Sequence, residues 1–208
     1  MGDTSGNTKI ADAGPAGWIA YSIATWMAWA FLCGFVTSKA LLFMACVSFA
    51  CTIPYLGAAI TQLKLGNAAG GVTWLYFGAF FAFASALNYG ATFFASIYHW
   101  EVDASILGYE WAVLGIVLIL TTPIFAKYAP AAATISVVGA DVGIAALSLI
   151  YFGYNGSFML QLSGWGFFVA GLFGIVMTAG GILESAGMAF PWASRCSRPP
   201  PKFACLQV

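Results

Sequence analysis

One carboxylate lies near the middle of an apolar stretch that is long enough to cross a lipid bilayer as a helix. The residue is Asp141, and the stretch runs from Pro130 to Phe152. A charge at that depth costs about 2.5 kcal/mol or more, so we expect Asp141 to face a protein interior or a water-filled path. Thr134 and Ser148 stand one heptad before and after it, on the same side of the helix. The three residues predict a pore wall on which Asp141 binds protons or substrate. The alternative is a structural carboxyl that is hydrogen-bonded to a neighbouring helix.

The composition is that of an integral membrane protein with the lipid bilayer as its partner. Of the 208 residues, 62% are hydrophobic and 7% are charged, whereas a soluble domain has about a quarter of its residues charged. The formal net charge is zero and the basic residues are scattered, so we expect no nucleic-acid partner. The five cysteines show no metal-ligand spacing, and the sequence has no nucleophile–base pair or phosphate-binding loop. We therefore expect no enzyme activity, cofactor or metal site.

Six apolar stretches predict an all-α, polytopic fold of six transmembrane helices, which we expect to surround the polar stripe of the Asp141 helix. They cover residues 16–36, 40–63, 71–96, 111–126, 130–152 and 162–182. We expect residues 15–190 to form this domain, after a polar arm over 1–14 and before a basic, proline-rich tail over 191–208.

The distribution of basic residues predicts the orientation of this domain. Six crossings place both termini on one side of the membrane, and every Lys and Arg except Lys39 falls on that side, so the positive-inside rule predicts cytoplasmic termini. The acidic connector over 99–110 then faces outward. We expect the plasma membrane, with an organelle membrane as the alternative. Small residues recur in the last stretch, where they serve close packing within one subunit or between subunits.

Three motifs outside the Asp141 helix form a set. Residues 6–18 (GNTKIADAGPAGW) precede the first apolar stretch, residues 64–67 (KLGN) lead to residues 76–81 (YFGAFF), and Gly164-Trp165 opens the glycine-rich last stretch. Their order and spacing resemble the acetate uptake transporter family, also called the YaaH or SatP family, with its NPAPLGL signature and its KxGN and SYGSFW motifs. The resemblance covers nearly the whole chain. It implies six-helix subunits, each with its own pore, that commonly assemble as homohexamers.

The resemblance also implies a function, namely transport of acetate, succinate and other small carboxylates by a channel or a proton-coupled carrier. The family's pore narrows at an aromatic residue on helix 1, an aromatic residue on helix 3 and a leucine on helix 5. The matching positions are Tyr21, Phe77 and Asp141. An anion in place of the leucine repels a carboxylate by about 4 kcal/mol at about 4 Å and an effective dielectric constant of about 20. Asp141 would therefore make the constriction a pH-sensitive gate.

Further polar residues are candidates for the pore wall. Thr25 follows Tyr21 by one helical turn and Thr73 precedes Phe77 by one turn, so a hydroxyl flanks each ring on the same helix face. Asn88 lies on the side of helix 3 that carries Thr73. It either lines the pore or hydrogen-bonds a neighbouring helix.

The start of the first helix is a candidate entrance to the pore. Of the family signature, Pro15 and Gly17 are retained, and Asp12 replaces the asparagine. These residues either shape an entrance where exposed amides meet an anion, or Asp12 simply caps the helix.

Three functions fit the sequence. The first is a pathway for small monocarboxylates, chiefly acetate. The second keeps the fold and passes ammonium, another small cation or a neutral solute, selected by Asp141. The third is a membrane sensor or structural subunit that transports nothing.

Overall fold

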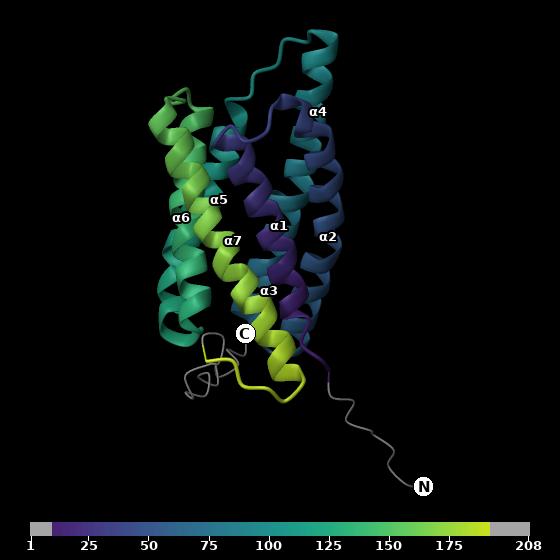
Figure 1. Ribbon diagram of the computed structural model, residues 1–208, viewed down its shortest axis with the longest axis vertical. Coiled ribbons are helices and arrows are strands. Elements are labelled where there is room, and N and C mark those ends of the chain that lie inside the picture. Colours follow the sequence, from purple (N-terminus) through teal and green to yellow (C-terminus); the bar gives the residue numbers. More distant parts are fainter. Residues whose placement is uncertain (1–9, 192–208) are drawn as a thin grey trace, which may run out of the picture.

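The protein is a bundle of long helices in a computed structural model, which describes residues 10–191 (Figure 1). No β-strand occurs in this part of the chain. The elements are α1 (Gly14–Leu32), the 3₁₀ turn η1 (Ser38–Ala40), α2 (Leu41–Lys64), α3 (Ala68–Tyr76), the π-helix η2 (Phe77–Ala84), α4 (Ser85–Tyr98), α5 (Ile106–Tyr128), α6 (Ala131–Tyr151) and α7 (Ser157–Ser185).

The helices have the length and composition of membrane spans. Five of them are long and apolar enough to cross a bilayer, namely Ser38–Lys64, Ala68–Tyr98, Ile106–Tyr128, Ala131–Tyr151 and Ser157–Ser185. The helix α1 has 19 residues and is not among these five. The chain is therefore an integral, multi-pass membrane protein, and a sixth crossing by α1 stays a prediction.

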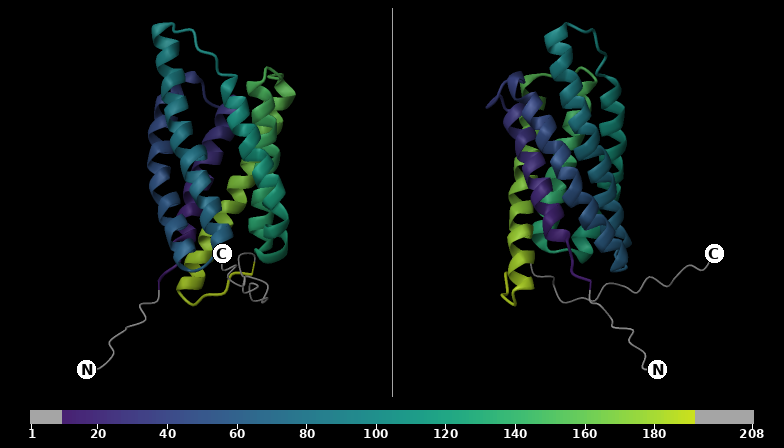
Figure 2. Two further views of the ribbon diagram at one scale, coloured as in Figure 1. Left: turned by 180° about the vertical axis from the view of Figure 1, so that it is seen from behind. Right: turned by 90° about the vertical axis from the view of Figure 1, so that its right-hand side faces the viewer.

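The described ends of the bundle lie together. The start of α1 and the end of α7 are at one end, and the connector from α4 to α5 is at the opposite end (Figure 2). Lys64 and Lys127, in the last turns of α2 and α5, belong to the end where α1 starts. This arrangement is the one that the charge distribution assumes, and the cytoplasmic side itself stays a prediction.

Several helix boundaries differ from those expected from the sequence. The first helix ends at Leu32 and not at residue 36, and the last begins at Ser157 and not at residue 162. The stretch predicted to begin at Trp111 begins at Ile106, so Glu110 lies inside α5. The acidic connector is correspondingly shorter, and within it the hydroxyl and amide of Ser105 hydrogen-bond Asp103 and lower the pKa of that carboxyl. The third stretch is one continuous helix with a π-helical middle, which hydrophobic periodicity does not reveal.

Glycines bring α6 and α7 into direct backbone contact. A Cβ atom added to Gly166 would lie 2.7 Å from the amide nitrogen of Gly143 and 2.9 Å from the carbonyl oxygen of Gly139. On the neighbouring face of α7, a Cβ on Gly174 would lie 2.4 Å from the Ser22 hydroxyl of α1. These small residues therefore serve packing within the chain, since each faces one of its own helices.

We predict that Gly166→Ala destabilises the protein, because its methyl group meets backbone that cannot rotate away. Overpacking of this kind costs about 1–3 kcal/mol. Thermal unfolding in detergent should show a lower midpoint for Gly166→Ala than for Gly57→Ala, whose added Cβ meets nothing within 4 Å in the middle of α2. Equal midpoints for the two variants would contradict the close α6–α7 contact.

Candidate functional site

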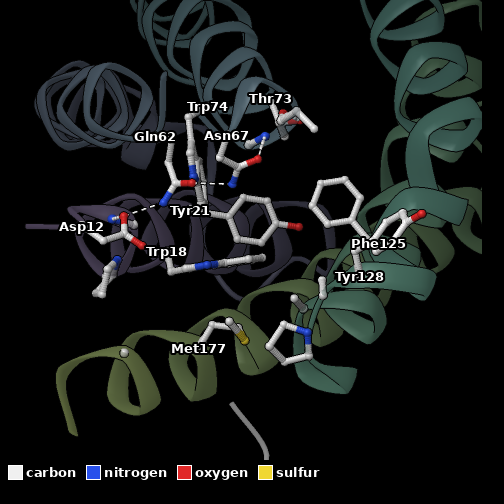
Figure 3. A pocket seen from close by; sticks show the side chains of 18 of the residues that line it. Asp12, Trp18, Tyr21, Gln62, Asn67, Thr73, Trp74, Phe125, Tyr128 and Met177 are labelled. Atoms are coloured by element: carbon white, nitrogen blue, oxygen red, sulfur yellow. Dashed lines mark hydrogen bonds between the residues drawn. The ribbon is translucent and has the colours of Figure 1, made fainter. Parts of the chain in front are cut away.

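A large cavity occupies the end of the bundle where α1 starts and α7 ends. Its volume is about 720 Å³, and its walls come from the segment before α1 and from α1, α2, α3, η2, α5, α6 and α7 (Figure 3). Its lining side chains include Trp18, Tyr21, Gln62, Thr73, Trp74, Phe77, Phe125, Tyr128, Val137, Met177 and Glu184. A cavity of this size accommodates a small organic solute with water.

An aromatic pair forms the inner end of this cavity. Tyr21 on α1 and Phe77 at the start of η2 meet edge to face, with 5.4 Å between ring centroids. They are 3% and 4% exposed, and we call them the aromatic constriction. Deeper in the bundle Phe81 contacts both rings, at 6.0 and 5.5 Å, so apolar side chains close the path in this conformation. The hydroxyl of Tyr21 donates to the carbonyl oxygen of Ser136 at 3.4 Å. Two of the three residues expected at the constriction thus lie together.

A chain of polar contacts forms one side of the mouth. Gln62 donates to Asp12 Oδ1 and its own carbonyl accepts from the side-chain amide of Asn67 (Figure 3). Asn67 in turn caps α3 by accepting from the amide of Gly70 at 3.1 Å. Asp12 Oδ1 also accepts from the amide of Gly14 at 2.8 Å. The carboxyl therefore occupies a donor at the start of α1 that an anion would otherwise use, although the N-cap position itself is Ala13.

Pro15 and Gly17 have different places near this mouth. Pro15 lines the cavity and packs against Gly181 of α7, where an added Cβ would lie 2.6 Å from the proline ring. Gly17 lets α1 approach α2, because its Cβ would lie 2.9 Å from that of Ala58. Gly17 is thus a packing position beside the cavity.

The electrostatic character of the cavity is mildly acidic. Asp12 and Glu184 are among its lining residues, and no described lining residue is basic. The indole N–H groups of Trp18 and Trp74 have no acceptor within residues 10–191, so they supply neutral donors. Such a surface suits a neutral solute with an acceptor oxygen better than an ionised carboxylate.

The predicted polar stripe of α6 lies at the interface with α5. Thr122 of α5 donates to Asp141 Oδ2 at 2.7 Å, Thr134 donates to a backbone carbonyl of α5 at 3.1 Å, and Ser148 donates to another at 2.8 Å. The part of α6 that lines the large cavity carries Val137 instead. Asp141 does not line the large cavity, and its Oδ2 atom finds its partner on α5. This arrangement matches the structural alternative stated above.

The remaining candidates are divided among three places. Thr73 lines the large cavity. Thr25 is fully buried, donates to the carbonyl oxygen of Tyr21 at 2.8 Å and faces Gly171 of α7 rather than the cavity. Asn88 lines a second cavity of about 50 Å³ near the opposite end of the bundle. The two alternatives stated for Asn88 both stay predictions.

We predict that rates of thiol labelling distinguish residues of the cavity wall from residues at the α5–α6 interface. In a background without native cysteines, Thr73→Cys should react with a charged, membrane-impermeant thiol reagent at least about tenfold faster than Asp141→Cys, since one side chain lines the cavity and the other is enclosed by α5. Reaction rates in vesicles of both orientations also identify the side to which the cavity opens. Equal rates at the two positions would place Asp141 on the pathway.

Comparison with known proteins supports the fold. No family profile matches the chain, and no curated protein matches it significantly. Among solved structures, one described as the structure of the bacterial acetate channel SatP matches with a TM-score of 0.76 and 16% identity, covering 89% of this chain and 100% of that chain. The chain thus shares its all-helical membrane fold with a bacterial acetate channel.

Proposed function

We propose that this protein transports small monocarboxylates, chiefly acetate, with succinate as a further substrate, as a channel or a proton-coupled carrier. The observation that carries the proposal is the contact of Tyr21 with Phe77 at the inner end of the large cavity. Both rings stand at positions that the sequence resemblance assigns to a pore constriction. The fold shared with a bacterial acetate channel supports the same function.

The cavity suits the neutral acid as the species that passes the aromatic constriction. An ionised carboxylate would lose hydration beside apolar rings and would approach the acidic side chains of Asp12 and Glu184 without a basic partner. A protonated acid carries no such charge and can accept from the indoles of Trp18 and Trp74. Transfer of a neutral acid is equivalent to moving an anion and a proton together, which is the outcome of proton coupling.

In this proposal Asp141 acts on the constriction without lining the large cavity. It interacts electrostatically with Tyr21 across the interface of α1 and α6, although Thr122 holds its other side. The charge state of Asp141 would then influence the constriction without the carboxylate entering the path. The pH-sensitive gate that we propose therefore works through the charge of Asp141 and not through its presence in the path.

Variants of Phe77 test the transport proposal. Phe77→Trp should lower acetate flux into liposomes at least about tenfold, because an added barrier of about 1.4 kcal/mol has that effect, and Phe77→Ala should raise it. Phe80→Ala is the matched control on the same π-helix, since Phe80 is 47% exposed and does not line the cavity. Lack of wild-type acetate flux from acidic to mildly alkaline pH would contradict the proposal.

A small cation such as ammonium is the second candidate cargo. The acidic lining, without a described basic residue, favours it. Reversal potentials in gradients of acetate and ammonium distinguish the two, because the permeant charge has opposite sign. Transport of neither, with the constriction closed throughout, would leave a sensor or structural role.

The biological arrangement follows from the same proposal. We place the transport domain at residues 15–190 in a homo-oligomer, a hexamer by resemblance, in the plasma membrane with both termini in the cytoplasm. The arm over 1–14 and the tail over 191–208 lie largely outside the described residues.

A further inference from the structure

Two buried oxygen atoms near the constriction have no hydrogen-bond partner. One is Asp141 Oδ1 and the other is the hydroxyl of Tyr76, on the residue just before Phe77. An unpartnered buried polar atom costs the free energy of its lost hydration, so two of them in one region call for an explanation. Asp141 Oδ2 is already satisfied by Thr122, which leaves Oδ1 as the atom to be paired.

The groups around these atoms form one electrostatic cluster. The charge of Asp141 acts on two titratable side chains, Tyr76 of α3 and Tyr21 of α1. Thr122 of α5 is its hydrogen-bond partner. From α5, Thr122 contributes its hydroxyl to Asp141, and Thr121 lies beside the Tyr76 hydroxyl. No described basic side chain takes part, so only a proton can neutralise the carboxyl locally.

The chemistry of the two unpartnered groups is complementary. A protonated carboxyl has one O–H to donate and a phenol oxygen can accept it, whereas an ionised carboxylate accepts from the phenol O–H. In either state, one hydrogen bond between Asp141 Oδ1 and the Tyr76 hydroxyl satisfies both atoms. It would reach from α6 to α3.

We propose that Asp141 and Tyr76 form a proton-binding pair, and that this pair is the positioning element through which pH acts on the aromatic constriction. The inference rests on the proposed transport function for its effect on flux, but the pair itself does not depend on it. The proton is held on Asp141 Oδ1. When the carboxyl ionises, the proton leaves toward the large cavity by way of Thr73, whose hydroxyl lies beside that of Tyr76 and which lines the cavity.

The link from the pair to the constriction is a series of ring contacts at the start of the π-helix. The ring centroids of Tyr76 and Phe77 lie 5.2 Å apart, and Phe77 in turn contacts Tyr21. An ionised Asp141 requires more donors than a neutral one and draws the Tyr76 hydroxyl toward α6. Since π-helical segments tolerate local changes of register and are frequent at functional sites, η2 can transmit that shift to Phe77.

Infrared spectroscopy of the full chain in liposomes tests the pair without a transport assay. A pH titration should show the C=O band of a protonated carboxyl that Asp141→Asn removes. Tyr76→Phe keeps the ring and deletes the hydroxyl, so this band should move to higher wavenumber. Its titration midpoint should move to higher pH by about half a unit or more, because a donor to the ionised form is lost.

Thr122→Val removes the observed hydrogen bond and should also shift the band. Tyr109→Phe should leave it unchanged, since Tyr109 is 63% exposed.

The effect on transport is measured as the ratio of variant flux to wild-type flux at each pH. This ratio removes the pH dependence that comes from ionisation of the solute itself, because that contribution is the same for both proteins. The ratio for Tyr76→Phe should vary with pH, and Asp141→Asn should remove the protein's own pH dependence.

A band that Thr122→Val shifts but Tyr76→Phe does not would overturn the pair, as would the lack of any Asp141 carboxyl band. Should Tyr76→Phe not assemble, Asp141→Asn gives the reciprocal measurement, a change in the phenol C–O band of a tyrosine. An intact pair in a protein without flux would overturn the proposed function alone.

Discussion

The bilayer imposes the constraint on which the rest of the structure depends, because polar groups in its apolar interior must find partners within the protein. The α5–α6 interface shows how this chain meets that constraint. Thr134, Asp141 and Ser148 each form a hydrogen bond with α5, at three successive levels of α6. The same hydrogen bonds fix the rotation of α6 about its axis. That rotation turns Val137 toward the large cavity and aligns the glycines of α6 with α7.

Fixed helix rotations determine where the aromatic side chains meet. The contact of α7 with α1 and α6 holds Tyr21 against the π-helical middle of the third span, so that its ring meets Phe77 and Phe81. Each aromatic contact of this geometry adds about 0.5–1.5 kcal/mol beyond burial. This free energy is small enough for a passing solute, or a change of protonation nearby, to separate the rings. The closed path is therefore compatible with transport. A π-helix at this position gives the third span a segment that can adjust.

Much of the fold could be predicted from the sequence, because spans of about 20 apolar residues follow directly from the thickness of the bilayer. Tyr21 and Phe77 could be placed together only through the family resemblance, since aromatic residues are common in spans. The start of α5 at Ile106 could not be predicted, because a charged residue such as Glu110 is typical of a connector and yet lies inside this helix. The π-helix leaves no periodic signal.

The site of Asp141 shows the limit of the sequence argument. A heptad stripe of polar residues requires a polar environment, and a neighbouring helix provides one as well as a pore does. Only the hydroxyl of Thr122, on another helix, distinguishes the two. The polar contacts of Gln62 at the mouth were likewise missed. The KLGN turn that precedes α3 was the available signal, because Asn67 both caps that helix and binds Gln62.

The central claim is that solute passes between Tyr21 and Phe77. The most direct measurement locks this passage reversibly in a background without native cysteines, by bridging Tyr21→Cys and Phe77→Cys with a short, cleavable bifunctional thiol reagent. The account predicts that acetate flux is lost when the bridge forms and returns when it is cleaved, while each single cysteine variant keeps its flux under the same treatment. Undiminished flux through the bridged protein would contradict the claim, because the path would then run elsewhere.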